Sequence, residues 1–87
     1  MPKIQIDIPE YNPQHGVPVA WQADSAVTVH ISDGFAIIQA NGPGLESLAR
    51  HPLTLAQKDV PAKSHIHYDD FMGDLEKGSC ALIIEKA

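Results

Sequence analysis

The chain has 87 residues, 44% of them hydrophobic and 20% charged, a composition typical of one thin-cored globular domain over residues 1–87. Six basic against eleven acidic residues give a net charge of −5, which argues against direct nucleic acid binding and against docking on anionic lipid. Because no apolar run approaches the ~20 residues that cross a bilayer and the N-terminus lacks a signal-peptide pattern, we expect a cytoplasmic protein whose single cysteine forms no internal disulfide.

The first 24 residues predict one strand followed by an irregular segment. Residues 3–8 alternate polar side chains with isoleucines, which predicts a half-buried strand that ends at Pro9. The proline-rich residues 9–24 form an unusually long connection, which suggests a function or a hidden strand. Residues 17–22 are the candidate for a short edge strand, because Pro18 suits an edge.

Residues 26–40 carry the clearest local signal, a β-hairpin. Asp33 and Gly34 are the dipeptide that a type I′ turn prefers between two alternating runs. A two-residue turn fixes the register, so that Ser32 faces Phe35. The face that we predict to line the core carries Val27, Val29, Ile31, Ala36, Ile38 and Ala40. The other face carries Thr28, His30, Ser32, Phe35, Ile37 and Gln39.

A helix is predicted next. Residues 41–44, Asn-Gly-Pro-Gly, end the strand and supply the capping asparagine and early proline of a helix start. Apolar residues then recur on one helical face at Leu45, Leu48, Ala49, Pro52, Leu53 and Ala56. Because Pro52 removes the hydrogen bond to Leu48, we expect a kink or a break near His51.

Two strands complete the predicted fold, at residues 64–69 and at residues 80–86, the second one more buried. Residues 70–79 form a polar connection between them. Hairpins on both sides of one helix predict an α+β fold. Its sheet is small and mainly antiparallel, with about five strands in the order β-β-β-α-β-β, and a single kinked helix covers one face.

Three sequence blocks resemble one known family. They are NGPGLESLARH (41–51) followed by LTLA (53–56), SHIHYDD (64–70) and GSCALIIE (78–85). In this order they resemble the bacterial immunity protein 32 family, small α+β proteins assigned to polymorphic toxin systems. The resemblance covers the chain from the hairpin onward. It implies a protein that binds and neutralises a cognate bacterial toxin, and it supplies no catalytic residues.

The sharpest local feature is a His-x-His-x-Asp pattern. On a strand, His65, His67 and Asp69 project to one face, where histidines at this spacing can chelate a divalent metal. Further candidate ligands are His30, His51 and Asp70. The alternatives are a solvent-facing strand edge with local hydrogen bonds, and a pH-sensitive or partner-contacting role, since histidine titrates near neutrality.

Catalytic residues are not expected. Cys80 beside a histidine resembles a nucleophile and its base, but a cysteine that opens an apolar strand is usually a small buried hydrophobe. The sequence contains no glycine-rich phosphate loop, nucleophile elbow or pair of carboxylates on a helix. We therefore predict a protein that is not an enzyme and needs no cofactor.

Acidic residues gather in one segment, at Asp69, Asp70, Asp74 and Glu76. Their spacing does not fit a calcium-binding loop. They form either a solvated loop or an anionic contact surface that attracts a basic partner and speeds association. By analogy, an inhibitor that covers the basic cleft of a toxin acting on nucleic acid benefits from such clustered carboxylates.

Aromatic and apolar residues add two further candidate contacts. Trp21 either caps the core or anchors a partner. Phe35 and Ile37 form a candidate dimer or partner patch, and a homodimer through this face or through an edge strand is compatible with the pattern.

The predicted function is steric, charge-complementary neutralisation of a cognate protein toxin. The predicted contact residues are Asp69, Asp70, Asp74, Glu76, His65, His67 and Trp21. Two alternatives remain: a small metal-binding protein built on His65, His67 and Asp69, and a standalone dimeric structural module, because a fold alone does not fix a function.

Overall fold

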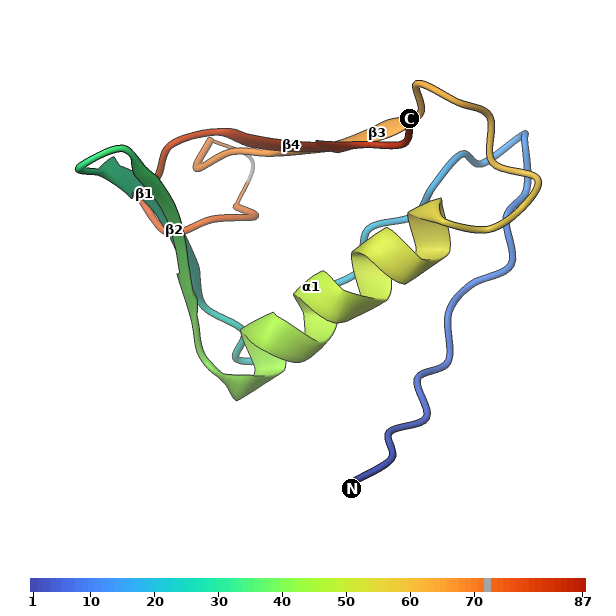
Figure 1. The fold of residues 1–87 in the computed structure, drawn as a ribbon, viewed down its shortest axis with the longest axis horizontal. Coiled ribbons are helices and arrows are strands. Elements are labelled where there is room, and N and C mark those ends of the chain that lie inside the picture. Colours follow the sequence, from blue (N-terminus) through green and yellow to red (C-terminus); the bar gives the residue numbers. More distant parts are fainter. Residues whose placement is uncertain (72) are drawn as a thin grey trace.

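The computed structural model describes residues 1–71 and 73–87, and within them it forms one helix and two small antiparallel sheets. The elements in chain order are β1 (Val27–Ser32), β2 (Phe35–Ala40), α1 (Gly42–Leu55), β3 (His65–Tyr68) and β4 (Leu82–Glu85). β1 pairs with β2, β3 pairs with β4, and α1 starts at the end of β2 and runs along one side of the β3–β4 pair (Figure 1). The α+β class is confirmed, whereas about five strands in a single sheet are not.

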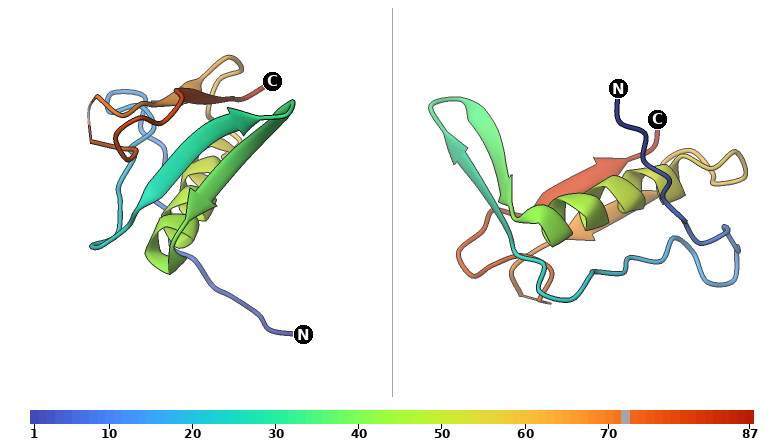
Figure 2. Two further views of the ribbon diagram at one scale, coloured as in Figure 1. Left: turned by 90° about the vertical axis from the view of Figure 1, so that its left-hand side faces the viewer. Right: turned by 90° about the horizontal axis from the view of Figure 1, so that it is seen from below.

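The hairpin has the predicted turn and register. Ser32 pairs with Phe35 across a turn in which Asp33 and Gly34 have φ values of 51° and 80°, as a type I′ turn requires. The predicted core face is buried only near the base of the hairpin, at Val27 and Val29. The outer half of the ribbon projects beyond the helix (Figure 2), so its apolar side chains stay in solvent.

An irregular segment occupies the edge of β1 that faces away from β2, which keeps the two sheets separate. The N–H of Cys80 donates to the Val29 carbonyl (2.7 Å), and the N–H of Glu76 donates to the Val27 carbonyl (2.8 Å). The Ser79 hydroxyl accepts from the Val29 N–H (3.2 Å). This irregular segment, residues 76–80, follows β1 without the regular ladder of a strand, and the chain enters β4 only after it.

The helix begins at the predicted cap. The Asn41 Oδ1 accepts from the N–H of Gly44 (2.9 Å) and from the N–H of Ala26 (3.0 Å), so one side chain joins the helix start to the hairpin. α1 continues through Pro52 to Leu55, and the predicted break near His51 is therefore absent.

The buried face of α1 is not the predicted apolar stripe. The buried residues are Gly44, Ser47, His51, Thr54 and Leu55, whereas Leu45 and Leu53 are exposed. The polar members of the buried face find partners for their side chains. The Ser47 hydroxyl donates to the Pro43 carbonyl (2.9 Å), and the Thr54 hydroxyl donates to the Arg50 carbonyl (2.8 Å). Satisfied polar groups can be buried at little cost, which the apolar periodicity does not reveal.

Neither strand predicted in the first 24 residues forms. Residues 3–8 are extended but unpaired, and Ile4 is 82% exposed. The segment runs beside α1, where the Arg50 Nε donates to the Asp7 carbonyl (3.2 Å). Residues 17–22 contain no strand either, and the only bridge in this part of the described chain joins Asn12 to Gly16. Alternation alone does not make a strand, because a strand also needs a neighbouring edge to pair with.

β3 and β4 form the predicted C-terminal hairpin pair, with shorter bounds than the predicted ones. Ile66 pairs with Ile84, and Tyr68 pairs with Leu82. The prediction that the last strand is the more buried one is wrong, because β4 alternates between half-buried and exposed side chains. The buried core consists of Val27, Val29, Leu55, Val60, Ile66, Tyr68 and Leu75.

Replacing Gly44 by alanine tests the close approach of α1 to β1. A Cβ at this position would lie 2.9 Å from the Ala26 carbonyl oxygen and 2.9 Å from the Val27 Cγ2. We expect Gly44→Ala to lower the free energy of unfolding by about 1–3 kcal/mol in urea titrations, although alanine favours helix formation. Gly42→Ala is the matched control, because nothing lies within 4 Å of its Cβ. Equal stability of the two variants would contradict the prediction.

Candidate partner-binding surface

The two histidines of β3 share an exposed face. Burial alternates along the strand, with His65 and His67 exposed and with Ile66 and Tyr68 buried. The His67 Nε2 lies 3.8 Å from the Asp69 Oδ2, which is a weak ion pair when the histidine is protonated. The period of two therefore orients these histidines as predicted.

Residues 1–71 and 73–87 contain no set of side chains that could ligate a metal ion. No group of three or more histidine, cysteine, aspartate or glutamate side chains lies close enough together there to hold an ion. Of the further candidate ligands, His51 is buried in the core and the Asp70 Oδ2 accepts from the Gly78 N–H (2.9 Å). The arrangement thus gives no support to the metal-binding alternative.

The four clustered carboxylates belong to what we call the acidic loop, residues 69–71 and 73–76. Asp70 and Glu76 are exposed, whereas Asp69 and Asp74 are half-buried. The Asp69 side chain accepts from the N–H of Phe71 (3.0 Å), and the Asp69 carbonyl accepts from the N–H of Leu75 (3.1 Å). These bonds fold the loop on itself and give its charged side chains a defined arrangement.

Phe71 was missed as a candidate contact. Its side chain is almost fully exposed at the acidic loop. A large aromatic residue in a mostly polar connection is the available signal, because such a residue is costly to leave in water.

Of the two alternatives for Trp21, capping the core or anchoring a partner, the structure shows the first. Trp21 is half-buried and packs against the core. Its ring meets those of His51 and Tyr68 edge-on, with centroid distances of 4.8 Å and 5.8 Å. Its Nε1 donates to the Asp74 Oδ1 (3.1 Å), so this carboxylate holds the acidic loop against the core.

A buried pair, His51 and Tyr68, lies beneath this contact. The His51 Nε2 is 2.6 Å from the Ala20 carbonyl oxygen, which can only accept, so the Nε2 carries a proton. The Nδ1 then accepts from the Tyr68 hydroxyl at 2.9 Å. The sequence marks His51 only as a candidate metal ligand, because its position lies off the apolar stripe.

The environment of Tyr68 disfavours the phenolate. Burial raises the pKa of Tyr68 from 10.0 to about 12, and the negative Asp74 adds to the rise. The hydroxyl therefore stays protonated and available as a donor to His51 across the physiological range.

The environment of Cys80 differs from the predicted one. Cys80 is exposed and precedes β4, so the expectation of a small buried hydrophobe is wrong. Its Sγ lies 3.5 Å from the adjacent Ala81 carbonyl oxygen, and its backbone N–H is the group that bonds β1.

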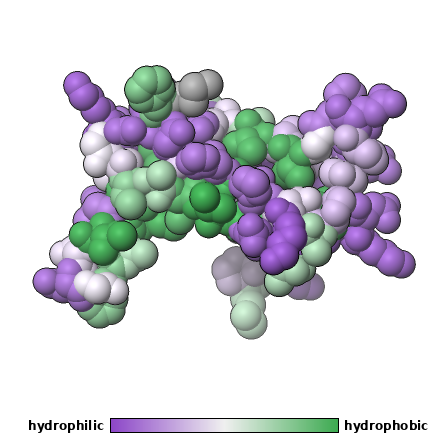
Figure 3. All heavy atoms as spheres, turned by 90° about the horizontal axis from the view of Figure 1, so that it is seen from above, coloured by the Kyte–Doolittle hydropathy of each residue, from purple (hydrophilic) through white to green (hydrophobic). Residues whose placement is uncertain are grey.

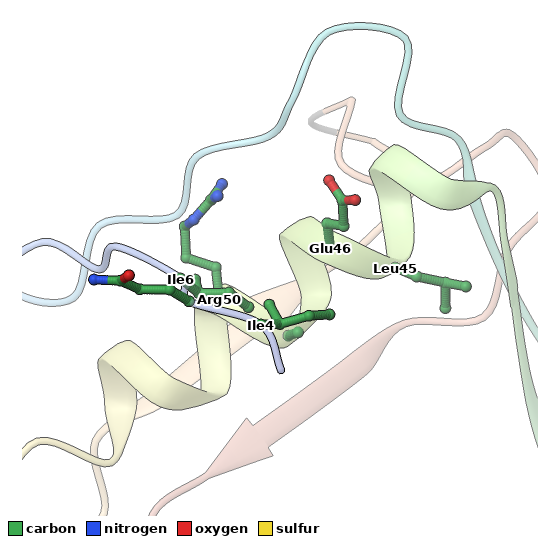
Figure 4. Close-up of a pocket in the computed structure, with 7 residues that line it drawn as sticks. Ile4, Ile6, Leu45, Glu46 and Arg50 are labelled. Atoms are coloured by element: carbon green, nitrogen blue, oxygen red, sulfur yellow. The ribbon is translucent and has the colours of Figure 1, made fainter. Parts of the chain in front are cut away.

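A hollow of about 370 Å³ lies between the N-terminal segment and the outer face of α1. Its labelled lining residues come from both elements (Figure 4): Ile4, Ile6, Leu45, Glu46 and Arg50. Most of this lining is apolar, and its charged groups are one carboxylate and one guanidinium on the same helix. Such a lining suits contact with another surface better than acid–base chemistry.

Comparison with known proteins gives one family. A family model described as Immunity protein 32 matches residues 37–87. No curated protein and no solved structure matches the chain. The matched residues include α1, β3, β4 and the acidic loop. None of the helices in the described residues is long and apolar enough to cross a membrane.

The pKa of Tyr68 generates a prediction on alkaline stability. Because the folded-state pKa lies above the unfolded one, its contribution is complete below pH 10 and is lost as the pH rises towards 12. The wild-type free energy of unfolding should fall by about 2–3 kcal/mol over this window through this group.

The variant Tyr68→Phe lacks the titrating hydroxyl and therefore isolates the pH-dependent contribution of Tyr68 to stability. At pH 8 the variant should be less stable by about 1–3 kcal/mol, because the Nδ1 of buried His51 loses its donor. In urea titrations at pH 8 and pH 11, the stability difference between the two proteins should narrow at the higher pH. A difference that is constant between these pH values would contradict the assignment.

Proposed function

Because the chain belongs to the immunity protein 32 family, we propose that it neutralises a cognate bacterial toxin by binding it, without transforming a substrate. The observation that carries this proposal is the family match, which spans the helix, the C-terminal strand pair and the acidic loop. Inhibition is steric: the chain covers the surface through which the toxin acts.

The proposed contact surface joins the exposed face of β3 to the acidic loop. It combines the histidines 65 and 67 with the exposed side chains of Asp70, Phe71 and Glu76. An exposed aromatic ring next to carboxylates offers apolar contact area together with long-range attraction. The net charge of −5 favours a partner whose contact surface is basic.

Three of the predicted contact residues hold the acidic loop in place: Asp69, Asp74 and Trp21. The Trp21–Asp74 hydrogen bond and the turn at Asp69 fix the loop before any partner arrives. A preformed loop loses little conformational entropy on binding, which favours tight association. We therefore assign these three residues a positioning role and assign direct contact to the exposed ones.

Co-expression tests the function itself. Cells that produce the toxin encoded next to this gene should survive when the chain is produced with it, and the two purified proteins should co-elute. A non-cognate toxin of the same chemistry is the control for general protection. Equal killing with and without the chain would refute the proposal.

Charge-neutral variants test the surface. Asp70→Asn combined with Glu76→Gln should lower the association rate with that toxin by roughly 3-fold to 10-fold at low salt, and by less at high salt. The amide that replaces the Asp70 carboxylate still offers an oxygen to the Gly78 N–H, so the loop keeps this hydrogen bond.

The matched control removes two exposed charges elsewhere, with Glu10→Gln and Asp59→Asn. Residues 56–63 lie at the far end of the molecule from residues 73–79 (Figure 1). At about 0.1 M salt the control should change the rate by less than about twofold, because the Debye length is then about 10 Å and more distant charges are screened. If both double variants lower the rate equally, net charge rather than this surface steers binding.

A further inference from the structure

One edge of the β1–β2 ribbon is open. In a hairpin with a two-residue turn, the residues that flank the turn, Ser32 and Phe35, form a hydrogen-bonded pair, and the pairs alternate from there. The backbone groups of Phe35, Ile37 and Gln39 therefore point to β1. Those of Ala36 and Ile38 point away from it, to the outer edge.

The corresponding groups on β1 are covered. Val27 and Val29 also point out of the ribbon, and residues 76–80 bond both of them. Within the part of the chain that the structure describes, the outward N–H and C=O groups of Ala36 and Ile38 have no hydrogen-bond partner. The ribbon thus has one closed edge and one unused edge.

The unused edge lacks the usual protection against pairing. β2 has the sequence FAIIQA, with no charged residue and no proline, and its six residues pair with β1 without a bulge. The ribbon also exposes apolar side chains on both of its faces near this edge. Ile31 is 67% exposed and Ile38 45% on one face, whereas Phe35 is 69% exposed and Ile37 37% on the other. Hydrophobic atoms are visible on the projecting ribbon at the lower left of Figure 3.

We propose that this edge binds a second copy of the chain, so that two ribbons form one four-stranded sheet around a two-fold axis. Antiparallel pairing of identical strands is self-complementary, as a two-fold interface requires. With Ile37 facing its symmetry mate, Ala36 of each copy pairs with Ile38 of the other. The outward N–H and C=O groups of both residues then all find partners.

The lack of charge on β2 favours a second copy over a basic partner at this edge. Each chain carries a net charge of −5, so two copies repel wherever their acidic surfaces meet. β2 is an uncharged strip through which they can meet without contacts between like charges. A basic partner is instead attracted to the acidic loop. A two-stranded ribbon is also marginal by itself, and a four-stranded sheet is not.

Sedimentation velocity and light scattering of the purified full chain test the proposal without any toxin. We expect a species of twice the 9.4 kDa chain mass at micromolar concentrations. Ala36→Pro removes an outward N–H and leaves the ladder to β1 intact. Ile37→Lys brings two like charges together near the axis. Each variant should raise the dimer dissociation constant at least about tenfold.

Leu53→Lys is the control, because it adds the same charge at an exposed apolar residue of α1. It should remain dimeric. A monomeric wild type up to several hundred micromolar would overturn the proposal, and so would a dimer that persists in both edge variants or dissociates equally in Leu53→Lys. Circular dichroism checks folding, and if Ala36→Pro unfolds the chain, the Ile37→Lys result decides.

Discussion

The hydrogen bond between His51 and Tyr68 is the interaction on which the interior depends. It joins α1 to β3, and the other ring nitrogen of His51 ties the proline-rich segment to both through the Ala20 carbonyl. A chain of this size has few apolar side chains to bury, so each polar group in its core must be paired. Every buried side-chain nitrogen and oxygen of the described residues has such a partner. The core is therefore specified by polar geometry as well as by apolar area.

The same cluster sets the shape of the surface. Trp21 rests edge-on against His51 and Tyr68, and its indole N–H holds Asp74. The backbone of Glu76 is bound to β1 from the other side. Hydrogen bonds thus anchor the acidic loop at Asp74 and at Glu76. Charges held in place are more useful for recognising one partner than charges on a mobile loop, because their arrangement can be complementary.

Some of these structural features could be predicted from short stretches of sequence. The turn dipeptide at residues 33–34 determined the hairpin and its register, and Asn41 determined the helix start, because both signals act within a few residues. The outward direction of His65 and His67 followed from the period of two. The buried face of α1 did not follow, since it contains Ser47, His51 and Thr54, whose partners come from tertiary contacts and from the helix itself. The internal roles of Asp74 and Trp21 likewise join residues 53 positions apart, beyond the reach of any local pattern.

The proposed dimer contact and the segment that anchors the acidic loop lie on opposite edges of one ribbon. Residues 76–80, which continue the acidic loop, close the β1 edge, whereas the β2 edge is open. Pairing through β2 therefore leaves the acidic loop of each copy accessible, so a dimer can present two toxin-binding surfaces. Pairing at the β2 edge would add hydrogen bonds to a ribbon whose β1 edge already bonds the segment that continues the acidic loop. The proposed dimer is therefore compatible with the proposed toxin binding.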